Sequence, residues 1–307
     1  MKKISIIPVL LITLGQLQAQ DTCRPKYNTP IKVAKLSSGK LAYLEKGSGK
    51  TILFIHGLGG NLSHWFKSVA ALSASYRCIA IDLPGYGWSG SQTDDTGNDK
   101  LQFYAGVVSE FLQRKKIKKV SLAGHSMGAQ VATIVTLHNK RVRKLILVSP
   151  AGLETFTGKE AAILKAATSP ASFEKQDEKT IRNNYKINFF QQPADVETLI
   201  QDRLSLSNCP GIKNYAETVS AGVRGMLAHP VRDSLQYLQI PVLVIFGSND
   251  ALIPNKYFHP EMTTATLAKT AAASMKNAKI EFINEAGHMV MYERNDATNT
   301  IIKNFLH

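Results

Sequence analysis

Cysteine is scarce in this sequence, and after the first residues no long apolar run occurs. Three of the 307 residues are cysteines, Cys23, Cys78 and Cys209. They are too few and too scattered for a disulfide framework or a metal cluster. The sequence also lacks an H-E-x-x-H motif and paired cysteines, so we expect neither a metal nor an organic cofactor. Without a second long apolar run, we expect a soluble mature protein with no stable membrane insertion.

Acidic side chains are outnumbered by basic ones. Asp and Glu total 23, against 37 Lys and Arg, which gives a formal net charge of +14. The basic residues are spread along the chain and form only two local clusters, at residues 114–119 and 140–144. Both clusters come just before predicted strands, where cations complement the carboxyl end of the preceding helix. No basic segment is interleaved with aromatic residues, so we expect no nucleic-acid partner.

The N-terminus has the pattern of a secretory signal peptide. Lys2 and Lys3 precede an apolar stretch, Ile4 to Leu14, and a small residue, Ala19, follows. A basic region, a short apolar region and a small residue at the cleavage point are the parts of such a signal. The apolar stretch is too short to span a bilayer comfortably. We assign residues 1–19 to the signal peptide and expect an exported protein, periplasmic or secreted, after cleavage near Ala19.

Export bears on how the cysteines are interpreted. Cys78 lies in an apolar strand, where we expect it to be a small core residue. An oxidising compartment would permit a bridge between Cys23 and Cys209. The sequence alone leaves the geometry of that bridge open.

From residue 31 onward, strands and helices alternate. The length, with 44% hydrophobic and 20% charged residues, fits one large folded domain with an insertion or two modest domains. Short apolar or β-branched runs predict strands, and apolar residues at helical spacing predict helices. The predicted strands are 31–36, 40–45, 51–55, 77–81, 119–122, 144–148, 241–246 and 279–283, and the predicted helices are 62–72, 99–115, 130–137, 262–275 and 290–305. This alternation indicates an α/β fold with a mostly parallel central sheet flanked by helices.

Between residues 151 and 235 the alternation stops. The composition there is helical, and no buried strand is evident. The segment interrupts the sheet between two of its strands, so we interpret 151–235 as a helical cap, or lid, over the carboxyl edge of the sheet. Open α/β sheets bind their ligands at that edge. The core domain is then formed by residues 20–150 and 236–307.

The stretch Gly124-x-Ser126-x-Gly128 lies where a strand must turn sharply into a helix. This context distinguishes a nucleophile elbow from an ordinary glycine-rich turn. The elbow holds its serine in a strained conformation, and glycines on either side let strand and helix approach closely. We therefore predict Ser126 to be a catalytic nucleophile at a helix N-terminus, where developing negative charge is stabilised.

A serine nucleophile needs a base and a group that orients the base. His288 follows the predicted strand 279–283 and precedes the last helix. The other seven histidines fit less well, because they lie in tight turns, in helical regions, at the surface or at the C-terminus. Asp250 comes just after the predicted strand 241–246 and is the candidate acid, although aspartate is also common in turns. The order Ser126, Asp250, His288 is the one expected of this arrangement.

The oxyanion of the transition state needs two N–H donors. His56-Gly57-Leu58-Gly59-Gly60 follows the predicted strand 51–55, and its glycines let backbone amides point into a site. We assign the backbone N–H groups of Leu58 and Met127 as the donors. His56 is interpreted as a residue that braces the turn.

These motifs together resemble the α/β-hydrolase superfamily over essentially all of residues 31–307. The stretches that carry the resemblance follow the order of the family and are His56-Gly57-x-Gly59-Gly60, Asp82-Leu83-Pro84-Gly85-x-Gly87, Gly124-His125-Ser126-Met127-Gly128, Gly247-x-x-Asp250 and Gly287-His288. The single cap resembles the branch that holds carboxylesterases, monoacylglycerol-lipase-like enzymes and C–C bond hydrolases. The resemblance implies that Asp82 and its loop brace the fold. It also implies that the long interval 251–287 extends one helix.

The expected function is an exported serine hydrolase that cleaves a carboxylic ester through an acyl-enzyme, with the triad Ser126, His288 and Asp250. The expected substrate is a small, apolar ester, and the oligomeric state stays open. A C–C bond hydrolase of the vinylogous-diketone type would use the same triad. An acyltransferase would differ by excluding water, and a non-catalytic binding protein could share the fold. Five cap residues could line an acyl pocket or form the cap's own core: Phe156, Phe189, Phe190, Met226 and Leu227.

Overall fold

The computed structural model describes residues 23–90 and 99–307. The predicted signal peptide, residues 1–19, lies outside these ranges. Within the described ranges, no helix is both long enough and apolar enough to cross a membrane.

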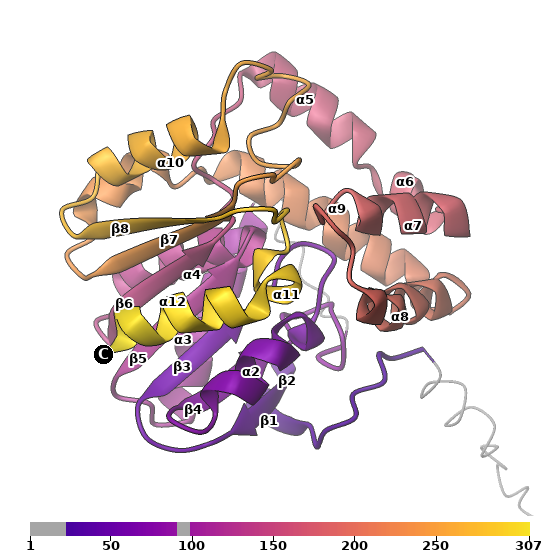
Figure 1. Cartoon of the computed structure of the whole chain (residues 1–307). Coiled ribbons are helices and arrows are strands. Elements are labelled where there is room, and N and C mark those ends of the chain that lie inside the picture. Colours follow the sequence, from indigo (N-terminus) through magenta and orange to yellow (C-terminus); the bar gives the residue numbers. More distant parts are fainter. Residues whose placement is uncertain (1–22, 91–98) are drawn as a thin grey trace, which may run out of the picture.

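A central sheet organises the chain (Figure 1). Its strands are β1 (Lys32–Leu36), β2 (Gly39–Lys46), β3 (Thr51–Ile55), β4 (Arg77–Ile81), β5 (Val120–His125), β6 (Val142–Val148), β7 (Val242–Gly247) and β8 (Ala278–Ile283). They form one eight-stranded sheet in the order β1-β2-β4-β3-β5-β6-β7-β8. Strand β2 runs antiparallel to β1 and β4, and the remaining neighbours are parallel. The predicted α/β fold is confirmed.

Helices cover both faces of this sheet. The flanking helices are α2 (Phe66–Leu72), α3 (Lys100–Arg114), α4 (Met127–His138), α10 (Thr264–Ala273), α11 (Val290–Glu293) and α12 (Asn295–Leu306). In Figure 1, α2 and α12 lie in front of the sheet, and α3 and α4 lie behind it. Strand β3 is buried on both sides because Ile52 and Phe54 face one apolar cluster, while Leu53 and Ile55 face the other.

Two predicted helices differ from the helices observed. The helix predicted over 290–305 is divided at Arg294 into α11 and α12. The long interval after Asp250 does not lengthen a helix, since α10 spans only Thr264–Ala273. The extra residues instead form a loop, 251–263, which contains Pro254 and Pro260. Proline lacks the N–H and the backbone freedom that a helix interior needs, which explains the loop.

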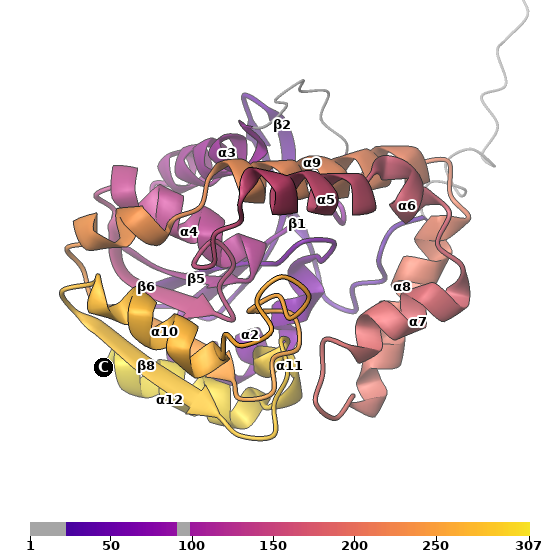
Figure 2. The ribbon, with the colours of Figure 1, turned by 90° about the horizontal axis from the view of Figure 1, so that it is seen from above.

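Between β6 and β7 the chain is helical. The elements there are α5 (Gly158–Ala167), α6 (Pro170–Glu174), α7 (Glu178–Lys186), η3 (Ala194–Val196), α8 (Glu197–Ser207), α9 (Ile212–Ala228) and η4 (Arg232–Tyr237). Figure 2, seen from above, shows α9 beside α5 and α7 beside α8. This is the interval that we interpret as the cap, and the name is kept below for residues 151–235.

An N-terminal segment, residues 23–31, ties the cap to the core. Cys23 and Cys209 form a disulfide with their Cα atoms 5.7 Å apart, which settles the bridge that the sequence left open. Trp88 Nε1 donates to the Pro25 carbonyl at 2.9 Å, and the ring of Tyr27 stacks on that of Trp88. The other cysteine, Cys78, is a buried free thiol in β4, as expected.

Candidate active site

Ser126 lies at the turn between β5 and α4, with φ 52° and ψ −119°. A non-glycine residue rarely adopts a positive φ, so this conformation is strained and must be held by its surroundings. The Ser126 N–H donates to the Val148 carbonyl at 3.0 Å, and its own carbonyl accepts from Ala151. A Cβ at Gly124 would lie 2.3 Å from the Gly128 carbonyl oxygen, so the turn needs glycine there.

Asp250 and His288 meet in a buried contact. Asp250 Oδ2 accepts a hydrogen bond from His288 Nδ1 at 2.8 Å. The other carboxylate oxygen accepts from the backbone N–H groups of Leu252 at 2.9 Å and Ile253 at 3.0 Å. The two side chains are at most 5% exposed. A buried carboxylate with three donors is held in place, and it fixes the proton of the imidazole on Nδ1.

The elbow and the His288 turn lie side by side. His125, the residue before Ser126, donates from Nε2 to the His288 carbonyl at 3.1 Å, and the two rings are 4.8 Å apart. Burial, followed by the charge of His288, lowers the pKa of His125 well below its ordinary value. Ser126 and His288 are both among the described residues, and no hydrogen bond joins their side chains. Catalytic hydrogen bonds often tighten only in the substrate complex.

The loop 56–60 lies against the elbow. A Cβ at Gly57 would be 3.2 Å from Ser126 Cβ, so the loop backbone passes close to the serine. The backbone N–H groups of Leu58 and Met127 donate to no acceptor within the described part of the chain. From the cap, the Tyr215 hydroxyl donates to the Gly59 carbonyl at 3.0 Å. This contact could not be predicted from the sequence, because no motif links residues so far apart.

His56 and Asp82 brace the loops around the site, as expected. His56 Nδ1 donates to the Gly57 carbonyl at 2.8 Å, and Nε2 accepts from the Leu83 N–H at 3.0 Å. Burial lowers the pKa of His56 to about 4, so the ring stays neutral at neutral pH.

The Asp82 carboxylate is fully buried and holds three segments together. It accepts from the backbone N–H groups of Leu62 and Trp88, each at 2.8 Å, and from the Tyr27 hydroxyl at 3.0 Å. Burial raises the pKa of this carboxyl group to about 7.

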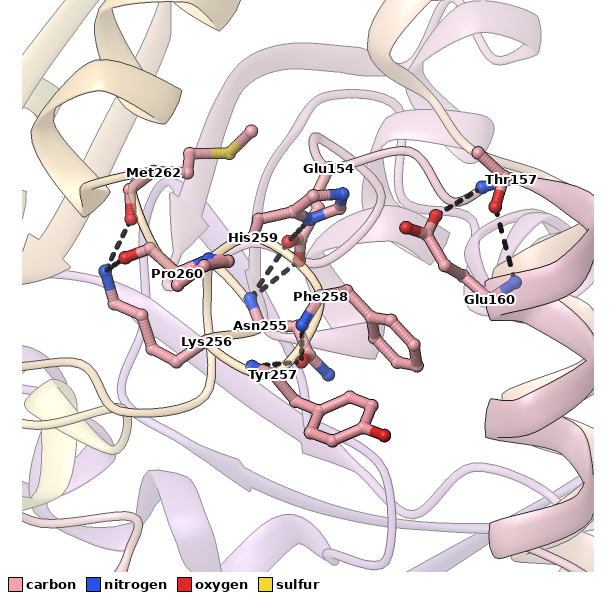
Figure 3. A network of polar contacts seen from close by, with 10 residues as sticks. All are labelled: Glu154, Thr157, Glu160, Asn255, Lys256, Tyr257, Phe258, His259, Pro260 and Met262. Atoms are coloured by element: carbon pink, nitrogen blue, oxygen red, sulfur yellow. Dashed lines mark hydrogen bonds and ion pairs between the residues drawn. The ribbon is translucent and has the colours of Figure 1, made fainter.

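A second polar network joins the cap to the loop after Asp250 (Figure 3). The buried Glu154 carboxylate accepts from the Asn255 N–H at 2.9 Å and pairs with His259 Nδ1. His259, one of the seven histidines set aside as the base, is partly buried, because its ring contacts Glu154 and stacks on Phe156. Nothing in the local sequence marks Glu154 as its partner.

The aromatic cap residues do not share one environment. Phe189 is buried in the core against Tyr292, with ring centroids 6.3 Å apart. Phe156 packs against Phe258 and His259, while Phe190 is 52% exposed. Phe189 therefore packs against the core domain and not only within the cap.

Comparisons with known proteins all indicate one fold family. A model described as the alpha/beta hydrolase fold matches residues 50–295. The chain is 30% identical over 282 residues to the dihydrolipoyllysine-residue acetyltransferase component of the acetoin cleaving system of Pseudomonas putida, covering 89% of this chain and 68% of that protein. It is 31% identical over 218 residues to the pimeloyl-[acyl-carrier protein] methyl ester esterase of Vibrio cholerae, covering 68% and 80% respectively. The crystal structure of a probable hydrolytic enzyme from Pseudomonas aeruginosa superposes with a TM-score of 0.79 at 23% identity, covering 92% of this chain and 96% of that one.

Proposed function

Because the chain belongs to the α/β-hydrolase fold family, we propose that it is a serine hydrolase that cleaves carboxylic esters through an acyl-enzyme. The observation that carries the proposal is the buried hydrogen bond between Asp250 Oδ2 and His288 Nδ1, 2.8 Å long, beside the strained elbow of Ser126. A carboxylate on Nδ1 leaves Nε2 as the basic nitrogen of the imidazole. This is the arrangement by which a histidine activates a serine.

In the acylation half-reaction, His288 Nε2 removes the proton of Ser126 Oγ as the oxygen attacks the ester carbonyl carbon. The carbonyl oxygen becomes an oxyanion and accepts hydrogen bonds from the Leu58 and Met127 N–H groups. The ester C–O bond then breaks, and the alcohol leaves with the proton from His288. Asp250 keeps the imidazole oriented and stabilises its positive charge throughout.

In the deacylation half-reaction, His288 removes a proton from water, which attacks the acyl carbon. The second oxyanion uses the same two N–H groups. The bond to Ser126 Oγ breaks, the proton returns to Oγ, and a carboxylic acid is released. Ester hydrolysis is also the activity named for the relative from Vibrio cholerae, which supports this class of substrate.

The test is covalent labelling of the mature protein with a fluorophosphonate, which reacts with activated serines. We expect wild type to be labelled at Ser126 and Ser126→Ala to be unlabelled, with hydrolysis of p-nitrophenyl acetate reduced by about 10⁴-fold or more. Ser121→Ala, which changes a serine on β5, the strand that leads to the elbow, is the matched control and should be labelled as wild type is. A folded wild-type protein that is neither labelled nor active would overturn the proposal.

A second assay separates ester cleavage from C–C bond cleavage, which would use the same three residues. The protein is given p-nitrophenyl esters and, separately, a vinylogous diketone. We expect turnover of the esters. Turnover of the diketone alone would replace the ester hydrolase with a C–C hydrolase.

Export is part of the proposal. The sequence pattern of residues 2–19 favours cleavage near Ala19, and the Cys23–Cys209 disulfide suits an oxidising compartment. N-terminal sequencing of protein from the envelope and medium fractions should find a chain that begins near Gln20. Full-length protein confined to the cytoplasm would contradict this.

A further inference from the structure

A cavity of about 670 Å³ lies where the cap, the N-terminal segment and the loop 56–60 meet. Its wall includes Gly59 and Gly60 of that loop, residues of α8 and α9, and Cys23 to Pro25. Ser126 and His288 are not part of the wall. Gly59 is the neighbour of Leu58, so the cavity begins one residue away from the proposed oxyanion donor, a Cα separation of about 3.8 Å.

The cavity wall contains a buried arginine that has no acidic partner. Arg203 on α8 is 8% exposed. Its guanidinium donates to Ser207 Oγ at 2.6 Å, to the Phe173 carbonyl at 3.0 Å and to Gln176 Oε1 at 3.3 Å. All three acceptors are neutral, and among the described residues no carboxylate forms an ion pair with Arg203.

A buried cation without a counter-ion is costly, so a fold seldom keeps one for stability alone. Arg203 is also held rigidly, because its guanidinium stacks over the ring of Tyr215 at 5.0 Å. A guanidinium has five N–H donors, and the three bonds above use both donors of Nη2 and one of Nη1, so at most the Nε donor and the second Nη1 donor remain for an anion. Arg203 is therefore suited to bind an anion.

The other charges on the wall indicate how many negative charges the anion would carry. Arg24 adds a second cation, held over the Trp88 ring at 5.5 Å. Asp202 adds one carboxylate, which accepts from the Lys26 N–H at 3.3 Å. Two cations and one carboxylate leave one positive charge, which suits a singly charged carboxylate better than a phosphate dianion.

We infer that this cavity binds a remote carboxylate of the substrate, with Arg203 as its cation, so that the preferred esters are half-esters of dicarboxylic acids. The inference rests on the proposed ester hydrolysis and makes it specific. It replaces the expected apolar substrate with one that is charged at the end away from the scissile bond.

The first experiment compares kcat/KM for mono-p-nitrophenyl esters of unbranched diacids of four to seven carbons with p-nitrophenyl esters of monoacids of the same length. For wild type, we expect the charged ester to be preferred, by about tenfold to hundredfold at the best chain length. In Arg203→Gln, the ratio of kcat/KM for the charged ester to that for the uncharged ester should fall to about one. Arg203→Lys should keep part of this preference, because it retains the positive charge and loses the planar guanidinium.

The matched control is Arg224→Gln. Arg224 is also a cap arginine, but it pairs with Glu217 at 2.7 Å and does not line the cavity. This variant should keep the wild-type ratio. If Arg203→Gln does not fold, the ratio in wild type and in Arg203→Lys decides the matter.

A binding measurement separates this inference from the proposed function. Glutarate should raise the Tm of wild type and not of Arg203→Gln, and uncharged glutaramide should raise neither. If glutarate binds but no ester is turned over, the proposed ester hydrolysis is wrong and the proposed carboxylate site stands. The proposed carboxylate site is wrong if esters are turned over with no preference for the charged ester at any chain length. It is also wrong if that preference survives in both Arg203 variants. In either case the proposed ester hydrolysis stands.

Discussion

The hydroxyl of Tyr215 donates a hydrogen bond to the carbonyl oxygen of Gly59, 3.0 Å away. This bond connects α9 of the cap to the loop that carries the Leu58 N–H group. The Tyr215 ring itself packs against the Arg203 guanidinium and makes a T-shaped contact with the ring of Tyr86. The cap therefore fixes the position of a loop that, in the proposed mechanism, stabilises the oxyanion.

Tyr215→Phe should slow hydrolysis of p-nitrophenyl acetate because it keeps the ring and removes only the hydrogen bond to Gly59. The loop would become less well positioned, and one hydrogen bond corresponds to about a fivefold effect. We expect kcat and kcat/KM to fall together, as for an interaction made in the transition state. Tyr185→Phe is the control, since its hydroxyl donates to Leu199 within the cap. A fall in both variants, or a change in KM alone, would contradict a positioning role for Tyr215.

Reduction of the Cys23–Cys209 disulfide should lower the free energy of unfolding by about 2–5 kcal/mol. The two cysteines are 186 residues apart in the chain, so the bridge restricts the unfolded state over a long loop. Urea unfolding with and without reductant measures the effect. In the double variant Cys23→Ser, Cys209→Ser, reductant should change nothing, because the remaining thiol, Cys78, is not in a bridge. A wild type that is equally stable in reductant would contradict this prediction.

Glu154→Gln should loosen the loop 251–263, which also supplies the Leu252 and Ile253 N–H groups that bind Asp250. Glutamine can still accept one hydrogen bond, but it loses the charge that pairs with His259. Removing a charge-assisted hydrogen bond in a buried site should lower the free energy of unfolding by about 1.5–3 kcal/mol, with a lower kcat for p-nitrophenyl acetate.

Glu160→Gln is the matched control for Glu154→Gln. Glu160 lies nearby on α5, where it forms a capping box with Thr157 and is only partly buried (Figure 3). Glutamine suits that position as well as glutamate does, so urea unfolding should find almost no change. Equal losses in the two variants would show that Glu154 has no special role.

Local sequence patterns were sufficient to predict most of the fold. The apolar run Thr51–Ile55 forms β3 with the same bounds. The glycines around Ser126 predicted the sharp turn, and the backbone at Ser126 has the strained geometry of such a turn. The positions of Asp250 and His288 after neighbouring parallel strands explain why they meet, since the ends of β7 and β8 lie side by side. The triad as a whole stays a prediction.

Contacts between distant segments could not be predicted in the same way. Glu154 meets His259, and Arg203 stacks on Tyr215, through packing of the cap that no local pattern encodes. The loop 251–263 is different, because Pro254 and Pro260 in the sequence already argued against a longer helix. There, the family resemblance suggested a helix, and the chemistry of the residues suggested otherwise.

His64 should make the fold sensitive to acid. It is buried, its Nδ1 has no hydrogen-bond partner, and burial, followed by the charge of His56, lowers its pKa from 6.5 to about 3. Between pH 6.5 and 3 the unfolded chain therefore binds a proton at this histidine that the folded chain does not, so the free energy of unfolding falls as pH is lowered through this window. The loss from this residue is about 2 kcal/mol by pH 5.

His64→Phe keeps an aromatic ring and removes the titration, so urea unfolding measured from pH 7 to pH 4.5 should show a shallower decline than in wild type. Asp82 acts with the opposite sign, because its pKa is raised to about 7 and protonation favours the folded state. Its contribution is present in both proteins and cancels in the difference between them. His138→Phe, at the end of α4, is the control and should decline as wild type does. If His64→Phe and wild type lost stability in parallel as the pH fell, burial of a neutral His64 would not be the cause of the acid sensitivity. His56, with its pKa of about 4, would then be the next histidine to replace.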